Sequence, residues 1–249
     1  MSAGVGRQDG ANPADFYPTP PRAAVALRDF WIANFGAPEI VIDPCAGMGC
    51  LLKPWQATTP VLGWERDQEI LEEGGDESRE LGISEGNGLQ VINELELTIG
   101  SAPVLVMVNP PFSAADEWVR TVVQSCERQD AAAAILLRSQ WIDDGNTKGR
   151  GAYRYEREPT AILRLPWRIR FNGKGADSCT YAWHIWHPDS ADFPSPFRAI
   201  AELERADAQK VTSSRMVPTF WARLNPTLSP SYELLGEFWA RAAAVSRGD

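Results

Sequence analysis

The chain has 249 residues, of which 44% are hydrophobic and 23% are charged. These values predict a globular protein with one large α/β domain, and the absence of an apolar run of about 20 residues excludes a transmembrane helix from the expected elements. The net charge of −9 argues against a protein that coats nucleic acid through bulk electrostatics.

The first expected element is a helix over residues 22–35, with apolar side chains at Val25, Leu27, Phe30 and Trp31. Residues 1–14 are small and polar, so we expect them to be disordered. Between the two, Pro18, Pro20 and Pro21 hold the chain extended at residues 15–21. We place the start of the folded domain at residue 15.

A buried strand is predicted within residues 39–43, and a glycine-rich turn follows it. The turn reads Asp43-Pro44-Cys45-Ala46-Gly47-Met48-Gly49. Glycines permit positive φ and close approach of the backbone to a ligand. Nothing basic lies beside Cys45 in the sequence, so we interpret it as a small filler and not a nucleophile.

The next two strands are predicted within residues 60–67 and 82–86. Acidic residues at the end of the second strand of nucleotide-binding folds bond ribose hydroxyls, and Glu65 fits this role, with Asp67 as second choice. A solvated strand end is the alternative. Asn87 follows the third short strand.

The strongest strand signal is the apolar run at residues 104–108, which predicts a strand buried on both faces. It ends in Asn109-Pro110-Pro111-Phe112. Prolines cannot donate to a sheet, so the strand must stop there and form a stiff corner at its carboxyl end, where open α/β sheets bind ligands. An ordinary proline turn is the alternative.

The second half of the chain continues the alternation of strands and helices. We expect a helix over residues 114–128, a strand over 131–141, a sixth strand and its exit over 161–171 and a seventh over 180–186. Residues 190–249 are predicted to form a helical extension packed on the same domain, with helices over 197–210 and 232–245.

Basic residues gather between Lys148 and Lys174, where eight basic side chains accompany two acidic ones. Residues 143–159 lack apolar periodicity and predict a long binding loop or lid. Arg150, Arg154 and Arg157 are its candidates for nucleic-acid phosphates, and Tyr153 and Tyr155 for stacking. A solvated surface loop is the alternative.

Two of these motifs resemble those of the S-adenosylmethionine-dependent amino methyltransferases: the turn at residues 43–49 and the corner at residues 109–112. The order of the motifs along the chain resembles that of the γ group of these methyltransferases. The compact length resembles that of phage-type enzymes. The resemblance implies a Rossmann-like, seven-stranded α/β sheet that is mostly parallel with one reversed strand and has helices on both faces. It implies S-adenosylmethionine as cofactor and N6 of adenine in DNA as methyl acceptor.

The resemblance also implies roles for single residues. Asn109 and the Pro110 carbonyl accept hydrogen bonds from the target amine, Pro111 shapes the corner, and Phe112 stacks on the base. Phe171 is the candidate for the second wall of the base site, with Trp167 in reserve and a plain core role as the alternative. The implied cofactor residues are Tyr17, Thr19, Pro20, Asp43, Pro44, Cys45, Ala46, Gly47, Gly49, Glu65, Arg66 and Asn87.

Other methyl acceptors remain possible: N4 of cytosine, adenine in RNA, and a protein glutamine. A binding protein that has lost catalysis is the rival from another class. We expect DNA as partner, with RNA as the alternative, and neither a membrane nor a metal. Four cysteines without a Cys-x-x-Cys pair predict reduced thiols and a cytoplasmic location. The oligomeric state is left open.

Overall fold

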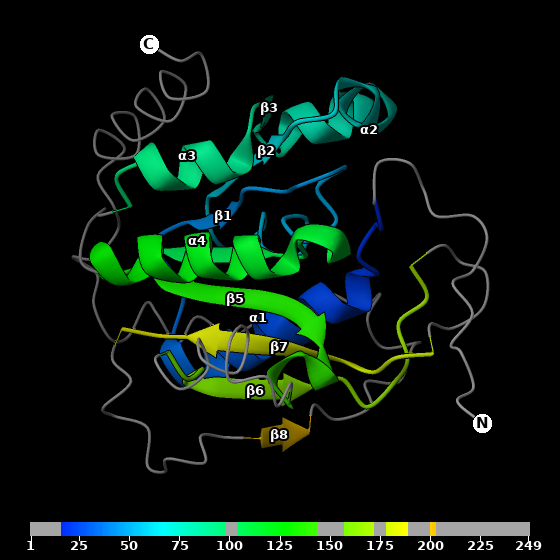
Figure 1. Ribbon diagram of the computed structural model, residues 1–249. Helices are drawn as coiled ribbons and strands as arrows, with labels where there is room; N and C mark the ends of the chain where they lie inside the picture. The colour runs from blue at the N-terminus through cyan, green and yellow to red at the C-terminus, as the bar shows by residue number, and fades with distance from the viewer. Residues whose placement is uncertain (1–15, 98–103, 144–156, 172–177, 189–199, 203–249) are drawn as a thin grey trace.

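The computed structural model describes residues 16–97, 104–143, 157–171, 178–188 and 200–202, and its strands form one sheet (Figure 1). The eight strands follow the order β3-β2-β1-β4-β5-β7-β6-β8. All neighbouring pairs are parallel except those that β7 makes with β5 and β6. The first seven strands are therefore the predicted sheet, with β7 as its one reversed strand. The strands are β1 (Val41–Asp43), β2 (Val61–Glu65), β3 (Ile83–Glu85), β4 (Leu105–Val108), β5 (Ala132–Arg138), β6 (Ala161–Arg164), β7 (Tyr181–Trp186) and β8 (Ile200–Glu202).

Helices cover both faces of this sheet, as predicted. One buried cluster joins α3 and α4 to the sheet, and a second joins α1 to the opposite face. Within the described ranges, no helix is both long and apolar enough to cross a membrane. The helices are α1 (Pro21–Phe35), α2 (Gln68–Glu80), α3 (Gly88–Glu94) and α4 (Ala115–Arg128), with 3-10 turns at η1 (Phe112–Ala114) and η2 (Ser139–Asp143).

Strand β4 shows why its sequence is apolar without a break. Val106 and Val108 belong to the cluster beneath α3 and α4, whereas Leu105 and Met107 belong to the cluster beneath α1. Both faces of the strand are buried, so neither face tolerates a polar residue. The prediction of a central strand is confirmed.

Strand β5 contains three successive alanines because its neighbour β7 is bulky. Ala133 pairs with Trp186, and Ala134 pairs with Ile185. All three alanines are fully buried. Small side chains beside large ones fill the two layers without voids, so position in the sheet overrides the low β-propensity of alanine.

Two predicted assignments are wrong. The fifth strand ends at Arg138, and residues 139–141 join the 3-10 turn η2. The sixth strand agrees with the prediction: it ends at Arg164, and its exit follows because Pro166 cannot extend its hydrogen bonding. Residues 200–202, inside the helix predicted over 197–210, form strand β8, which pairs with β6. The expectations for residues 1–14, for the helix over 232–245 and for most of the extension lie outside the described residues.

The segment before α1 is brought to the carboxyl edge of the sheet. Trp183 on β7 donates its indole N–H to the carbonyl of Ala23 over 3.0 Å and so ties the first turn of α1 to the sheet. Because parallel strands present their carboxyl ends at one edge, Asp43, Glu65 and Asn109 meet there. This edge carries the candidate site.

Candidate functional site

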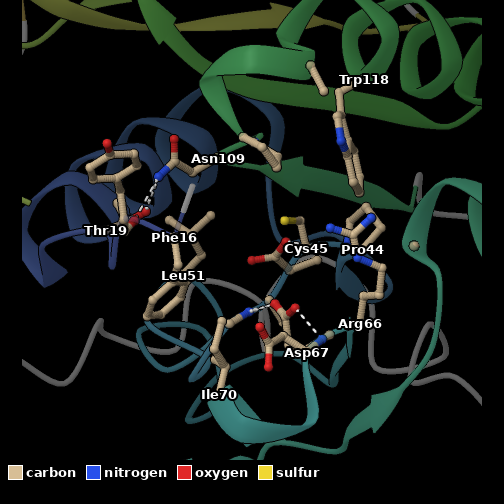
Figure 2. A pocket seen from close by; sticks show the side chains of 18 of the residues that line it. Phe16, Thr19, Pro44, Cys45, Leu51, Arg66, Asp67, Ile70, Asn109 and Trp118 are labelled. Carbon is tan, nitrogen blue, oxygen red and sulfur yellow. Dashed lines mark hydrogen bonds between the residues drawn. The ribbon is translucent and has the colours of Figure 1, made fainter. Parts of the chain in front are cut away.

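A cavity of about 530 Å³ opens at the carboxyl ends of β1, β2 and β4. All predicted cofactor residues line it except Pro20 and Gly49, and so do Asn109 and Pro111 of the predicted catalytic corner. In Figure 2, Asn109 and Thr19 lie at one end, Asp67 and Ile70 at the other, and Cys45 between them. The structure thus brings the two sequence motifs together around one space.

Glu65 connects the first two strand ends within this cavity. One of its carboxylate oxygens accepts the N–H of Gly47 over 2.9 Å, and the other accepts the N–H of Asp67 over 2.9 Å. Asp67 uses its own carboxylate elsewhere, as the N-cap of α2. Of the two carboxylates, Glu65 is therefore the one that backbone N–H groups fix at the cavity, whereas Asp67 caps a helix.

Gly47 is favoured by its backbone conformation, and a side chain there would also displace a neighbouring ring. Its φ is +54°, and a Cβ at this position would lie 2.5 Å from the ring of Phe16. Gly49 also has a positive φ of +84°, but it packs against Leu81 and not on the cavity. The two glycines of the motif thus have different tasks: one faces the ligand space and one fits the core.

Asp43 is 1% exposed, and its carboxyl group is only partly hydrogen-bonded among the described residues. One oxygen accepts the N–H of Cys45 over 3.0 Å, and the other has no hydrogen-bond partner among the described residues. Burial raises the pKa of Asp43 to about 8, the Cys45 N–H opposes that change, and the charge of Glu65 adds to it. A cationic ligand group at this oxygen would relieve the penalty of burying the charge.

Asn87 lines the cavity, as predicted for a cofactor residue. Its amide oxygen also accepts the N–H of Leu89 over 3.2 Å and that of Gln90 over 3.5 Å, and so caps α3. A ligand amine at Asn87 would share this oxygen with the cap. The next residue, Gly88, was missed: a Cβ there would lie 1.6 Å from the Pro44 carbonyl, and the Asn-Gly pair was the available signal.

Asn109 presents one free acceptor. Its amide nitrogen donates to the Tyr17 carbonyl over 3.2 Å and to the Thr19 hydroxyl over 3.0 Å. Its amide oxygen is buried and has no hydrogen-bond partner in the described part of the chain. A buried oxygen without a donor costs about 1–3 kcal/mol, which a substrate N–H could recover.

The predicted base-stacking surface is covered by other rings. Tyr17 stacks on Phe112 with centroids 4.9 Å apart, and Phe171 meets Phe112 edge-on at 5.7 Å. Tyr181 contacts both phenylalanines. Rings at these distances touch directly, so no base fits between Phe112 and Phe171 here. Neither of them lines the cavity, nor does the buried Pro110. The reserve residue Trp167 lies under Arg22, 3.9 Å from its guanidinium carbon.

Of the three arginines predicted to contact nucleic acid, Arg157 is described, and it does not lie at the cavity. Arg157 lies at the amino edge of the sheet, where its carbonyl accepts the indole N–H of Trp186 and its guanidinium lies 3.1 Å from Glu127. That edge is opposite the cavity, since Trp186 pairs with Ala133 at the start of β5. Arg150 and Arg154 lie outside the described residues.

Trp118 was also missed. It lies on α4, is 7% exposed and lines the cavity, and Figure 2 shows its ring directed toward Pro44. Its spacing with Val119 and Val122 is typical of the buried face of any helix, so no sequence motif indicated a functional role for it. Phe16, Ser113 and Glu117 also line the cavity without a sequence signal.

Solved structures share this architecture, whereas no protein-family profile and no curated protein matches the sequence. The methyltransferase subunit of a type I restriction-modification system from Streptococcus thermophilus is 16% identical, with a TM-score of 0.51 over 70% of this chain and 45% of that one. A type I modification subunit from Vibrio vulnificus is 16% identical, with a TM-score of 0.48 over 72% of this chain and 46% of that one.

A protein from Pyrococcus horikoshii, provisionally described as an RNA methyltransferase, is 17% identical, with a TM-score of 0.49 over 68% of this chain and 84% of that one. The chain spans about half the length of the two type I subunits. At these identities the likeness concerns the fold. Together with the strand order and the reversed β7, it shows that the chain has the Rossmann-like methyltransferase fold.

Proposed function

We propose that the chain binds S-adenosylmethionine in the cavity and directs methyl transfer to N6 of adenine in DNA. The observation that carries the proposal is the amide oxygen of Asn109: the residue lines the cavity, and this oxygen is buried and unpartnered among the described residues. Such an oxygen can accept a hydrogen bond from an amine, but it cannot act as a strong base.

The cofactor residues fit this ligand by their own chemistry. Glu65 is held by two backbone N–H groups and keeps lone pairs for ribose hydroxyls. The unpartnered oxygen of Asp43 suits the ammonium of the methionine part. Trp118, Pro44 and Leu89 offer apolar surface for a purine ring. When bound, S-adenosylmethionine supplies the electrophilic methyl group.

The acceptor chemistry fits Asn109. The lone pair of a nucleobase amine is delocalised into the ring, which makes the nitrogen a weak nucleophile. Acceptance of its N–H by Asn109 draws the nitrogen toward tetrahedral geometry and aims the lone pair at the methyl group, which is catalysis by positioning and by stabilising developing charge. The proton lost from the methylated nitrogen leaves to solvent, because an amide oxygen is too weak a base to keep it.

DNA is favoured by the resemblance of residues 109–112 to adenine methyltransferases. Arg168 and Arg170 are exposed after β6, at the same edge of the sheet as the cavity, and can contact a phosphate backbone. The Streptococcus thermophilus protein is named as part of a restriction-modification system, which agrees with DNA as acceptor. RNA adenine, cytosine N4 and protein glutamine are outcomes that the experiment below separates.

The test offers DNA, RNA and protein pools to the enzyme with methyl-labelled S-adenosylmethionine. Labelled polymers are then digested, and the products are separated by mass. We expect N6-methyladenine from DNA, and no label with Asn109→Ala as matched control. N4-methylcytosine, labelled RNA or methylglutamine as the only product would contradict the DNA-adenine assignment, and no transfer to any pool would contradict catalysis.

A further inference from the structure

The side chain of Asn109 is held from the segment that precedes α1. Its NH₂ group donates its two protons to two acceptors, the Tyr17 carbonyl and the Thr19 hydroxyl. A backbone carbonyl only accepts, so it fixes which end of the amide is the nitrogen. Both donor positions of the amide are thus engaged, and its oxygen is directed elsewhere.

This holding segment is itself anchored. Thr19 is 5% exposed, so its hydroxyl is sheltered from competing water. Pro18, Pro20 and Pro21 restrict the backbone around it. The first turn of α1 closes with the Ala23 N–H on the Pro20 carbonyl, and the Ala23 carbonyl is bonded to Trp183 on β7. The two acceptors are therefore fixed relative to the sheet that positions Asn109.

We propose that Thr19 and the Tyr17 carbonyl form a clamp that orients the Asn109 amide and makes this site require asparagine instead of aspartate at position 109. The inference rests on the proposed function, in which the Asn109 oxygen receives the substrate amine. Thr19 is a positioning residue in this scheme, because it acts on the substrate through Asn109.

The requirement for asparagine follows from the donor count. An ionised carboxylate at position 109 would place an oxygen against the Tyr17 carbonyl, and two acceptors at about 3 Å repel each other. Only the protonated acid can restore a donor to the Tyr17 carbonyl. Its O–H would donate to that carbonyl, while its second oxygen stays available to accept the N–H of the substrate amine. The pH at which the substituted enzyme works therefore reports on the clamp.

The first experiment is the pH-rate profile of Asn109→Asp. We expect measurable turnover at low pH that falls about tenfold per pH unit above the pKa of the introduced carboxyl, because the protonated form is the competent one. The wild-type enzyme should show no such fall in the same range. Turnover of Asn109→Asp equal to wild type from pH 6 to pH 9 would overturn the requirement for asparagine.

The second experiment compares Thr19→Val with Thr19→Ser. Valine keeps the shape and removes the acceptor, so we expect kcat to fall about tenfold. Serine restores the hydroxyl and should restore kcat. A Thr19→Val enzyme with wild-type kcat, or a Thr19→Ser enzyme as impaired as Thr19→Val, would contradict the role of the hydroxyl.

The third experiment does not depend on catalysis. In a double-mutant cycle, Thr19→Val should lower Tm by about 2–4 °C in wild type, the size expected for one buried hydrogen bond in a domain of this length, and by less in Asn109→Ala. Equal shifts in both backgrounds would overturn the clamp. A wild-type enzyme that methylates no pool, together with clear coupling, would refute the proposed function and leave the clamp in place.

Discussion

The two halves of the candidate site differ in how ready they are for a ligand. The cofactor half, around Gly47, Glu65 and Asp43, encloses an open cavity and a buried Asp43 oxygen that has no hydrogen-bond partner in the part of the chain that the structure describes. The acceptor half, around Phe112, is filled by Tyr17, Phe171 and Tyr181 in direct ring contact. A cofactor can enter the first half as it stands, whereas a base can stack on Phe112 only after Tyr17 moves.

The difference has a physical origin in how each half is assembled. The cofactor half consists of strand ends and the turns that directly follow them, so backbone hydrogen bonds fix its shape. The acceptor half is assembled from side chains of four distant segments, and aromatic rings that lack a ligand minimise exposed apolar surface by packing on each other.

The largest effect is expected from Gly47→Val in the cofactor half. The substitution places a side chain against the Phe16 ring at a positive φ, so cofactor binding and methyl transfer should both be lost. Gly75→Val is the matched control, since Gly75 has φ +56° with nothing within 4 Å of its Cβ position. Calorimetry with S-adenosylmethionine decides the matter, and equal affinity losses in both variants would show that backbone strain alone is responsible.

Asn109→Ala should separate the two halves. Loss of a preorganised polar group at a reacting centre costs on the order of a hundred- to a thousandfold in turnover. Because Asn109 lies at the end of the cavity away from Asp67 and Ile70, we expect cofactor affinity to stay within a few-fold. A folded Asn109→Ala protein that no longer binds S-adenosylmethionine would contradict its assignment to the acceptor.

The cofactor half should also respond to pH through Asp43. With a pKa of about 8 before binding, the carboxyl must lose its proton to meet an ammonium group. S-adenosylmethionine affinity should therefore rise between pH 6 and 7.5, by up to tenfold per unit, with proton release detectable in buffers of different ionisation enthalpy. Asp43→Asn should remove this dependence, and an unchanged slope in that variant would place the proton on another group.

The same carboxyl affects stability in the cofactor-free protein. Its folded pKa lies above the unfolded value of 3.8, so between those values the folded state keeps a proton that the unfolded state has lost. The contribution of Asp43 to the free energy of unfolding is fully present below pH 3.8 and is lost as the pH rises toward 8. Thermal unfolding at pH 8 should then find Asp43→Asn more stable than wild type. A lower Tm for the variant would contradict the burial penalty.

Tyr17→Ala tests whether the acceptor half is closed by that ring. The stacked pair with Phe112 is worth about 0.5–1.5 kcal/mol, so its removal should lower KM for DNA by roughly two- to tenfold. The Tyr17 carbonyl belongs to the backbone, so the hydrogen bond to Asn109 survives the substitution. If cofactor affinity falls instead and KM for DNA is unchanged, Tyr17 serves the cofactor and not the base.

The sequence predicted the cofactor half better than the acceptor half for the same physical reason. Strand ends and glycine turns follow from local patterns, and Asp43, Gly47 and Glu65 lie together because parallel strands share an edge. The positions of Trp118 and of the Tyr17 ring depend on tertiary packing, which no local pattern encodes. Asn87 was recognised by its place after a strand, but the demand of α3 for an N-cap engaged its oxygen.

The smallest expected effects are changes in DNA affinity on substitution of single arginines. They should show along which edge of the sheet the DNA lies beyond the acceptor half. Arg168 and Arg170 are exposed beyond β6 at the cavity edge, whereas Arg157 lies at the opposite edge beside Glu127. Each phosphate contact contributes a slope of about −0.9 in log affinity against log salt. Arg168→Gln and Arg170→Gln should therefore each flatten the slope by up to that amount, and Arg157→Gln should leave it unchanged. The measurement is fluorescence anisotropy of duplex DNA across a salt series, with S-adenosylmethionine affinity as control. A flatter slope for Arg157→Gln alone would mean that DNA follows the amino edge of the sheet and that the cavity edge is not its path.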